Sequence, residues 1–560
     1  MEVHRHRTSV DAGDPDAIEV TLRSTARGFT WRIANSSNHP VTVRSVTAVC
    51  TLTGLAGRLR MYRNGWQSWS ETSVATLGVD TDPAMAPGAI EFNVMIHHAD
   101  PRGARADRLR SEMVTVLADD RAAVLAGFLG GDLHDGTLWV SRGQTGQELR
   151  VQAYLGDAVL APGEERDLHE VWLASVDDPL DALDEWASEY GRRSLARTRS
   201  AYQVGWCSWY RYFEHVRELD VRENLAAVGD WPLDVFQVDD GYQSAVGDWL
   251  ITADSFPSGL PPLASAIAAA GCRPGLWLAP FLVAPGSRLA ASHPDWVARF
   301  PDGQPLIAMY NAHWGGFVHT LDTSRPDVQD HLAHLARSLV DMGFGFLKLD
   351  FTYAPGMEGR YHDRSMTPAQ RVRAGFDAIR RGAGERTFLL GCGAPLGAAV
   401  GVVDGMRVGP DVAPWWSPRA ALWNLPGYMG TVPAAANAWR NTLSRAHLHR
   451  RLWVNDPDCL MLRTTDTELS GDQVRAWAMA VAASGGMAMV SDDLTALDGA
   501  AAKLLEEVLE IGVRVDGAAI AGDGPRCDDL LTDPLPRRLR ADGVRLEGEP
   551  ERGFARVVSG

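Results

Sequence analysis

Lysine is nearly absent from this chain of 560 residues. Lys348 and Lys503 are the only two, and every other residue in the total of 54 Lys and Arg is an arginine. Long apolar runs are also absent: no stretch approaches the roughly 20 residues of a transmembrane helix. The first residues, MEVHRHRTSV, contain no apolar core of signal-peptide length. These absences predict a cytoplasmic protein that does not act in a membrane.

Excess positive charge and paired cysteines are missing as well. The net charge of -17 argues against nucleic acid or an anionic membrane as a partner and is compatible with a neutral ligand such as a sugar. The six cysteines include no CxxC pair and have no histidine at zinc-ligand spacing. We therefore expect reduced thiols. With 45% hydrophobic residues, the chain has enough apolar material for two or three globular domains.

The pattern of apolar residues changes along the chain. Residues 1–175 contain short alternating runs such as AIEVTLRS, broken by Gly, Pro, Asn and Asp, which predict a β-sandwich. Residues 176–200 look like a helical linker. Residues 201–510 alternate between strand and helix, and residues 511–560 predict a small C-terminal β domain.

Eight strand candidates lie in the alternating region, at 202–209, 235–240, 273–280, 345–351, 387–392, 404–411, 452–458 and 487–493. Helical stretches separate most of them, which predicts a (β/α)8 barrel, an α/β fold. Two spacings are irregular. The segment between Cys392 and Asp404 is short for a crossover helix, whereas 281–343 is long and predicts an insertion with strand-like pieces around HWGGFVHTLD.

Carboxylates and aromatic side chains collect at the predicted C-terminal ends of these strands, where such a barrel builds its active site. Acidic side chains bind sugar hydroxyls, Trp and Tyr stack on sugar rings, and two carboxyl groups cleave the glycosidic bond, so this mixture is typical of sugar cleavage. The strand-end residues are Trp209, Tyr210, Asp239, Asp240, Trp277, Lys348, Asp350, Cys392, Arg407, Asp411, Asp456, Asp458, Asp492 and Asp493.

Asp350 and Asp411 follow strands that have one strand between them, so their backbones should lie about 10 Å apart. Two inward side chains can then approach to the roughly 5 to 5.5 Å of a retaining pair, although an inverting pair remains possible. Lys348 projects to the same side as Asp350 and should keep it ionised, or the two form only a structural salt bridge. Asp411 would need burial or a nearby ionised Asp350 to raise its pKa and hold a proton.

Two further motifs have both a functional and a structural interpretation. Asp239 and Asp240 are consecutive, so a regular strand cannot point both inward, and the pair could instead be an ordinary turn with a helix cap. The segment NGWQSWS could carry Trp66 to a site on another domain, or place core aromatic residues near a turn.

Several motifs in one order resemble glycoside hydrolase family 36, the α-galactosidases or melibiases: GWCSWYRYF, QVDDGYQ, LKLDF, LGCGAPL, DGMRVGPD and LWVNDPDCLMLR. The resemblance extends from Asn64 to about Asp493. It implies a retaining, exo-acting α-galactosidase that hydrolyses terminal α-D-galactosyl residues of oligosaccharides such as melibiose and raffinose. It also implies that no metal or other cofactor is needed.

The resemblance implies that Asp350 is the nucleophile and Asp411 the acid/base, while Asp239 and Asp240 bind the galactose 4-OH and 6-OH. The other implied substrate-binding residues are Lys348 and Arg407, on further hydroxyls; Trp209, Tyr210 and Trp277, as pocket walls; Cys392 and Gly393, near the 2-position; and Trp66, from the sandwich.

Four other functions remain as alternatives. An α-N-acetylgalactosaminidase or an α-galactosyl transferase would use the same scaffold, and the space around residues 392–394 would distinguish the former. A metal-dependent barrel enzyme and a non-catalytic sugar-binding protein belong to other classes; the lack of a ligand-spaced His or Glu cluster and the presence of both carboxylates argue against them. The natural oligosaccharide and the oligomeric state are not predicted.

Overall fold

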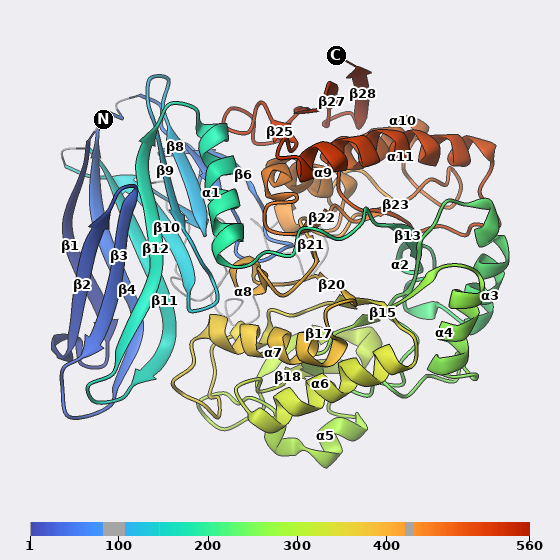
Figure 1. The fold of residues 1–560 in the computed structure, drawn as a ribbon, viewed down its shortest axis with the longest axis horizontal. Helices are drawn as coiled ribbons and strands as arrows, with labels where there is room; N and C mark the ends of the chain where they lie inside the picture. Colours follow the sequence, from blue (N-terminus) through green and yellow to red (C-terminus); the bar gives the residue numbers. More distant parts are fainter. Residues whose placement is uncertain (1, 56, 82–106, 145, 420–428, 560) are drawn as a thin grey trace.

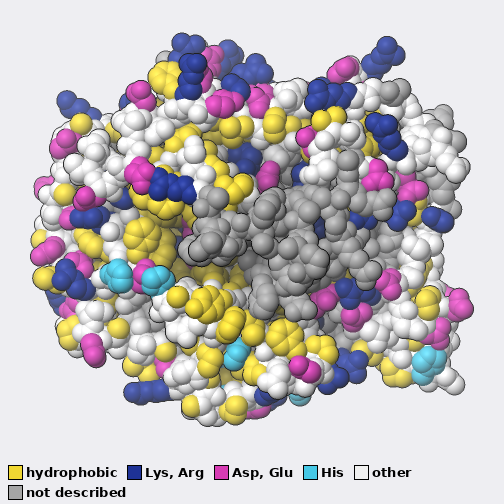
Figure 2. Space-filling model, turned by 180° about the vertical axis from the view of Figure 1, so that it is seen from behind, with side chains coloured by type: hydrophobic (Ala, Val, Ile, Leu, Met, Phe, Trp, Pro, Cys, Tyr) yellow, Lys and Arg dark blue, Asp and Glu magenta, His cyan; other side chains and the backbone are white. Residues whose placement is uncertain are grey.

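The computed structural model describes residues 2–55, 57–81, 107–144, 146–419 and 429–559. Two antiparallel sheets make up the N-terminal part, and a parallel sheet with helices around it makes up most of the remainder (Figure 1). On the face shown in Figure 2, acidic and basic side chains are interspersed, while hydrophobic side chains gather beside the residues drawn in grey.

The two N-terminal sheets pack face to face. Successive side chains of a strand point to opposite faces, and in β3 Phe29, Trp31 and Ile33 all point to the buried face. Leu138 and Val151 of the other sheet belong to the same core. In sheet order, the strands are β1 (Glu2–Ala12), β4 (Val41–Thr53), β11 (Gln147–Leu160), β10 (Asp135–Arg142) and β7 (Arg108–Glu112), then β2 (Ile18–Thr25), β3 (Gly28–Asn35), β12 (Glu165–Val176), β9 (Ala123–Phe128), β8 (Val114–Ala118), β5 (Arg60–Arg63) and β6 (Ser73–Thr76).

Helix α1 (Pro179–Arg193) connects these sheets to the rest of the chain. Asp178 caps it by accepting hydrogen bonds from the backbone N–H groups of Leu180 and Asp181. Buried Trp186 donates to the Phe128 carbonyl of β9 at 2.9 Å, and Tyr190 donates to the Gly397 carbonyl at 3.1 Å. The predicted linker helix is therefore wedged between the two parts.

The parallel sheet contains a strand in each of the eight predicted ranges. Its ends in the pairing order are β22 and β23, which are separated in the chain by only Pro457 and Asp458, so the sheet curls round on itself. The predicted α/β class with flanking antiparallel sheets is thus confirmed. The order is β22 (Val454–Asp456), β21 (Gly405–Arg407), β20 (Phe388–Gly391), β19 (Phe346–Leu349), β15 (Arg273–Leu278), β14 (Val235–Val238), β13 (Val204–Cys207), β24 (Ala488–Val490) and β23 (Cys459–Leu460).

Helices connect successive strands of this sheet. The sequence predicts a helix over 434–450, but α9 ends at Ser444 and a 3-10 turn, Ala446–Leu448, follows it. The short 392–404 segment holds only the one-turn α8 (Leu396–Ala399). The helices are α2 (Trp209–Tyr212), α3 (Glu218–Ala227), α4 (Leu260–Ala269), α6 (Pro326–Asp341), α7 (Pro368–Ala383), α9 (Ala435–Ser444), α10 (Gly471–Ser484) and α11 (Gly499–Ile520).

The long 281–343 segment contains the predicted insertion. A small antiparallel sheet, β16 (Leu282–Val283), β18 (Gly316–Thr320) and β17 (Ile307–Asn311), precedes α6, and α5 (Arg288–Ser292) lies within it. This insertion places Trp314 beside the end of the parallel sheet, as described below.

A four-stranded antiparallel sheet ends the chain: β25 (Arg526–Cys527), β26 (Arg538–Ala541), β27 (Val544–Glu549) and β28 (Phe554–Ser559). It lies beside α10 (Figure 1). The predicted domain boundary between residues 510 and 511 falls within α11. In the described residues we find no helix with the length and apolar character needed to cross a membrane.

Candidate active site

A cavity of about 210 Å³ opens at the C-terminal ends of the parallel strands. Side chains from five connections of the parallel sheet and from the ends of β15 and β19 converge on it, and the N-terminal part contributes Trp69. The lining residues are Trp69, Trp209, Asp239, Asp240, Trp277, Asn311, Trp314, Lys348, Asp350, Phe351, Pro410, Asp411, Thr431 and Pro433.

Asp350 comes directly after β19 and receives two N–H donors. The indole Nε1 of Trp277 donates to Oδ2 at 2.9 Å, and the backbone N of Phe351 donates to Oδ1 at 2.8 Å. Phe351 has a φ of 52°, which turns the chain sharply after the strand. These two hydrogen bonds fix the orientation of the Asp350 carboxylate at the end of the strand.

Asp411 follows β21, and β20 separates that strand from β19, as predicted. Its side chain is 37% exposed, toward the cavity, and Oδ1 accepts from Nη1 of Arg407 at 3.0 Å. The surrounding protein raises the pKa of Asp411 to about 7, because it displaces water; Arg407 opposes the rise, and the charges of Asp458 and Asp350 add to it.

Arg407 is only 2% exposed in its side chain and contacts three carboxylates. Besides Asp411, it meets Oδ2 of Asp456 through Nε at 3.1 Å and Oδ1 of Asp458 through Nη2 at 2.8 Å. Burial lowers the pKa of Arg407, but Asp458 and Asp456 raise it well above its usual value. One guanidinium charge is thus shared by three acidic groups.

Asp239 and Asp240 both line the cavity, although they are consecutive. Strand β14 ends at Val238, so the two residues belong to the turn that continues to Gly241, whose φ is 118°. Lys348 Nζ lies 2.9 Å from Oδ2 of Asp239. The sequence places Lys348 beside Asp350, but its closest ion pair is with Asp239.

Asp240 has a different partner set. Its Oδ2 accepts from the indole N–H of Trp314 at 2.8 Å, and its Oδ1 accepts from Gln243 Nε2 at 2.5 Å. Burial raises the pKa of Asp240 to about 6; the two donors lower it, and Asp239 raises it further. Asp239 and Asp240 thus present acceptor oxygens to the cavity, and hydrogen bonds and an ion pair from neighbouring side chains fix the position of both carboxylates.

Aromatic rings form much of the remaining wall. The centroids of Trp314 and Phe351 are 5.1 Å apart, and those of Trp69 and Phe351 are 5.0 Å apart, both edge to face. Among the described residues the indole N–H of Trp69 has no hydrogen-bond partner. This wall therefore presents mainly apolar ring faces and edges to the cavity.

The structure corrects the prediction for Trp66. Trp66 is buried away from the cavity and donates through Nε1 to Oδ1 of Asp135 at 3.0 Å, while Trp69 lines the cavity instead. Both belong to the NGWQSWS motif, so the motif does reach the parallel-sheet part. The sequence identified the right segment but the wrong ring.

Four other predicted residues lie behind the wall rather than on it. Arg407 holds the carboxylates, and the hydroxyl of Tyr210 donates to Asp458 Oδ2. Cys392 is 1% exposed. At Gly393, with a φ of 52°, an added Cβ would lie 2.7 Å from the Trp69 ring, so this glycine allows that ring to approach.

A buried arginine fixes the segment that carries Trp69. Arg445, just after α9, donates to the carbonyls of Ser68 (2.7 Å), Gly65 (3.2 Å) and Gln67 (3.3 Å) and to Asn64 Oδ1 (3.0 Å). Burial lowers the pKa of Arg445 to about 10. The N-terminal loop is therefore bound to the parallel-sheet part through its own backbone.

Sequence reasoning missed seven lining residues. Trp69 could have been found, since it stands in the same motif as Trp66, and Trp314 is the tryptophan of the predicted insertion. The rest carry no chemical signal in the sequence; they are Asn311, Phe351, Pro410, Thr431 and Pro433. Part of the 412–432 connection, residues 420–428, lies outside the described residues.

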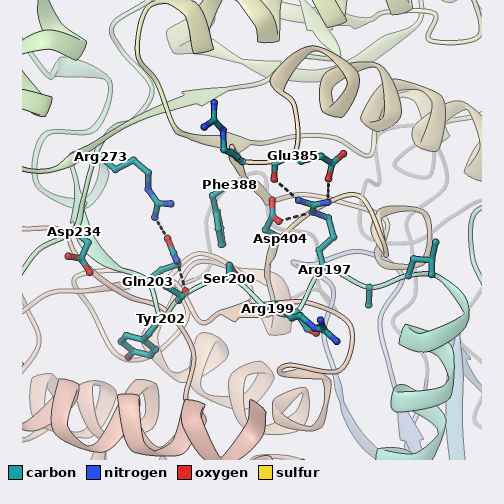
Figure 3. A pocket seen from close by; sticks show the side chains of 15 residues that line it. Arg197, Arg199, Ser200, Tyr202, Gln203, Asp234, Arg273, Glu385, Phe388 and Asp404 are labelled. Carbon is teal, nitrogen blue, oxygen red and sulfur yellow. Dashed lines mark hydrogen bonds and ion pairs between the residues drawn. The ribbon is translucent and has the colours of Figure 1, made fainter. Parts of the chain in front are cut away.

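A second cavity, of about 790 Å³, lies at the opposite ends of the strands (Figure 3). Its acidic residues Glu385 and Asp404 both form ion pairs with Arg197, at 2.5 and 2.8 Å, and Arg273 donates to Gln203. Asp404 also pairs with Arg380 at 2.5 Å. We place the candidate site in the smaller cavity, because it lies at the C-terminal ends of the strands and is lined by both Asp350 and Asp411.

Within the described residues, no group of three or more His, Cys, Asp or Glu side chains is arranged to hold a metal ion. Of the acidic residues that line the cavity, Asp411 pairs with Arg407 and Asp239 pairs with Lys348.

Comparison with known proteins gives consistent matches. A family model described as melibiase matches residues 192–370. The curated α-galactosidase AgaA of Geobacillus stearothermophilus is 28% identical over 187 residues, which cover 31% of this chain and 24% of that protein. The matched part thus spans about a quarter of that curated relative.

Solved structures match over more of the chain. TtGalA, an α-galactosidase from Thermus thermophilus in complex with p-nitrophenyl α-D-galactopyranoside, is similar at a TM-score of 0.70 and 28% identity, covering 95% of this chain and 99% of that one. TtGalA in complex with stachyose is similar at a TM-score of 0.67 and 30% identity, covering 88% and 99%.

Proposed function

Since the chain belongs to the melibiase family of glycoside hydrolases, the family 36 α-galactosidases, we propose that it is a retaining, exo-acting α-galactosidase. It would hydrolyse terminal α-D-galactosyl residues of oligosaccharides such as melibiose and raffinose. One observation carries the proposal: Asp350 and Asp411 line the same cavity in opposite electrostatic settings. Asp350 accepts two N–H hydrogen bonds, whereas burial raises the pKa of Asp411 to about 7, which favours its protonated form.

The proposed reaction is a double displacement. Ionised Asp350 attacks the anomeric carbon while protonated Asp411 gives its proton to the glycosidic oxygen, so the bond to the leaving sugar breaks and a galactosyl ester forms. Asp411, now ionised, then takes a proton from water as the water oxygen attacks the same carbon. The ester bond breaks, and Asp350 returns to its carboxylate form.

The remaining lining residues support recognition of a galactosyl group. Asp239 and Asp240 would accept hydrogen bonds from the 4-OH and 6-OH, and Lys348 would donate to a hydroxyl beside them. Trp277 and Trp314 give the cavity apolar faces for the sugar ring. Trp69 adds a further aromatic ring, and Trp209 stands at the edge of the cavity.

The same proposal includes the finer description of the fold. The short link between β22 and β23 supports closure of the parallel sheet into a (β/α)8 barrel. The proposed domains are the N-terminal β-sandwich, the helical linker, the barrel and the small C-terminal β domain.

The first experiment is a panel of nitrophenyl α- and β-glycosides, assayed with and without a chelator. We expect hydrolysis of the α-galactoside alone and no effect of chelation. Cleavage of the α-N-acetylgalactosaminide instead would keep the catalytic pair but contradict the galactose specificity. Proton NMR of the first product should show α-galactose, and initial formation of β-galactose would rule out retention. Transfer of galactose to added sugar in preference to water would favour the transferase.

A further inference from the structure

Asp458 is a buried carboxylate to which the proposed reaction gives no role. Its side chain is 0% exposed, and it lies in the link between β22 and β23 with a φ of 93°. Oδ1 accepts from Cys459 N at 2.7 Å and meets Arg407 Nη2 at 2.8 Å. Oδ2 accepts from Val412 N at 2.8 Å and from the hydroxyl of Tyr210. Four donors from three segments of the chain therefore hold one side chain.

Two of these donors connect Asp458 to Asp411. Val412 is the next residue after Asp411, so its hydrogen bond to Asp458 fixes the backbone that presents the catalytic carboxyl group. Arg407 contacts Asp458 through Nη2 and Asp411 through Nη1. Any movement of Asp458 would thus displace Asp411 through both its backbone and its charged partner.

The charges around Asp411 are unevenly matched. Arg407 from β21 and Lys348 from β19 face it as cations, and Asp350 and Asp458 face it as anions. Arg407 is shared with Asp456 and Asp458, and Lys348 pairs with Asp239, so neither cation serves Asp411 alone. A proton on Asp411 relieves this excess of negative charge.

We propose that Asp458 is a positioning residue for the acid/base, holding Asp411 through Val412 and Arg407 and keeping it protonated until the glycosidic bond breaks. The inference rests on the proposed α-galactosidase activity. Tyr210 acts one step further back, because its hydroxyl donates to Asp458 and stabilises the charge there. This gives the buried Tyr210 a role that differs from walling the pocket.

Asp456 provides a matched control. It also pairs with Arg407, through Nε at 3.1 Å, and it also lies in this part of the chain. Its other hydrogen bond is from the backbone N of Asp458 at 2.9 Å. Asp456→Asn therefore removes one charge from the same arginine without removing the bond to Val412.

The test compares the pH dependence of kcat/KM for the wild type and Asp458→Asn, with p-nitrophenyl α-galactoside and raffinose as substrates. Asparagine tolerates the positive φ at this position and has nearly the same shape. The acid must be protonated, so the wild-type rate should fall as pH rises through about 7. Removing the anionic neighbour should move this basic limb about one pH unit lower, and Asp456→Asn should move it less.

Two substrates with different leaving groups distinguish an effect on the protonation of Asp411 from a general disturbance of the structure. Nitrophenolate leaves without needing a full proton, whereas the sugar released from raffinose needs one. A shift of one pH unit lowers the protonated fraction of Asp411 at pH 7 from about a half to about a tenth, so the loss in kcat should be about fivefold larger for raffinose. Equal losses on the two substrates, with an unmoved basic limb, would overturn the inference.

Tyr210→Phe tests the same inference with the charge retained. Removing a donor to the carboxylate raises the proton affinity of the Asp458 and Asp411 pair, so the basic limb should move to higher pH. A move to lower pH would overturn the inference, and this variant decides the question if circular dichroism shows that Asp458→Asn does not fold. A wild type inactive on every α-galactoside would instead defeat the proposed function.

Discussion

Asp350 and Asp411 have the same side chain but face different neighbours. Asp350 receives an indole and a backbone N–H, whereas Asp411 receives one guanidinium that two other carboxylates share. Because the two side chains are identical, their different behaviour has to come from the residues around them. The division of labour that we propose is set by Trp277 and Phe351, which donate to Asp350, and by the burial of Asp411, which outweighs the opposing charge of Arg407.

We predict that Asp350→Asn lowers kcat on p-nitrophenyl α-galactoside by about 10⁴-fold, because the amide cannot form the galactosyl ester. The measurement is steady-state hydrolysis, with circular dichroism to check the fold. Asp377→Asn is the control: Asp377 pairs with Arg373 on α7 and its side chain is 52% exposed, so activity should not change. Near-normal turnover by Asp350→Asn would refute the nucleophile assignment.

The sequence showed which residue types collect at the site more clearly than it showed which side chains line the cavity. The acidic strand ends at Asp239, Asp240, Asp350 and Asp411 were identifiable because short apolar runs stop at them. The choice between Trp66 and Trp69 was not, since both stand in one turn-rich motif. What separates them is Asp135, which binds the Trp66 indole from a distant strand.

Among the elements, the loop 64–72 is the one whose position depends most on another part of the chain. Arg445 donates to three of its carbonyls, and Asn441 of α9 donates to the Ser70 carbonyl at 2.8 Å. These bonds replace water for backbone groups that are otherwise buried. Hydrogen bonds from Asn441 of α9 and from Arg445, just after α9, therefore fix the position of this loop.

We predict that Arg445→Met lowers the free energy of unfolding by about 2–4 kcal/mol, because it leaves several buried carbonyls without a donor. It should also raise KM for α-galactosides, since Trp69 is no longer held at the cavity. Urea unfolding followed by circular dichroism measures the first effect.

The control for Arg445→Met is Arg475→Met. Arg475 forms an ion pair with Glu507 and its side chain is 48% exposed, so its loss should cost less than about 1 kcal/mol. Equal destabilisation by the two substitutions would show that the buried hydrogen bonds of Arg445 contribute little.

Element types followed from sequence wherever periodicity was strong. The sequence predicts a helix over 367–383, and α7 begins one residue later, with Thr367 and Gln370 forming its capping box. Helix α9 was predicted too long, because the apolar pattern continues through Ala446–Leu448 after the helix has ended. The β16–β18 sheet was only indicated, since its strands are short and the sequence does not show which of them pair.

For the molecule as a whole, the scarcity of lysine gives a direct probe of the site. Lys503 is exposed on α11, whereas Lys348 is 5% exposed and paired with Asp239. Burial lowers the pKa of Lys348, but Asp239 outweighs it and the pKa lies well above the usual value. The protonated Lys348 should therefore not react.

We predict that an amine-acylating reagent modifies Lys503 of the folded protein but spares Lys348. Peptide mass spectrometry before and after unfolding measures this, and the unfolded chain should show both lysines modified. Activity on an α-galactoside should survive the treatment of the folded protein. Acylation of Lys348 in the folded state would contradict its buried ion pair.

The hydrogen bonds from Arg445 to the loop that carries Trp69 also have a consequence for biosynthesis. Ser68 and Arg445 are 377 residues apart in the chain. At roughly 5–20 residues per second on the ribosome, they are made roughly 20–75 s apart. Trp69 is therefore synthesised early, and its loop can form these hydrogen bonds only after α9 and Arg445 have been made. A nascent chain should gain its sugar-binding cavity only after most of the parallel sheet has left the ribosome.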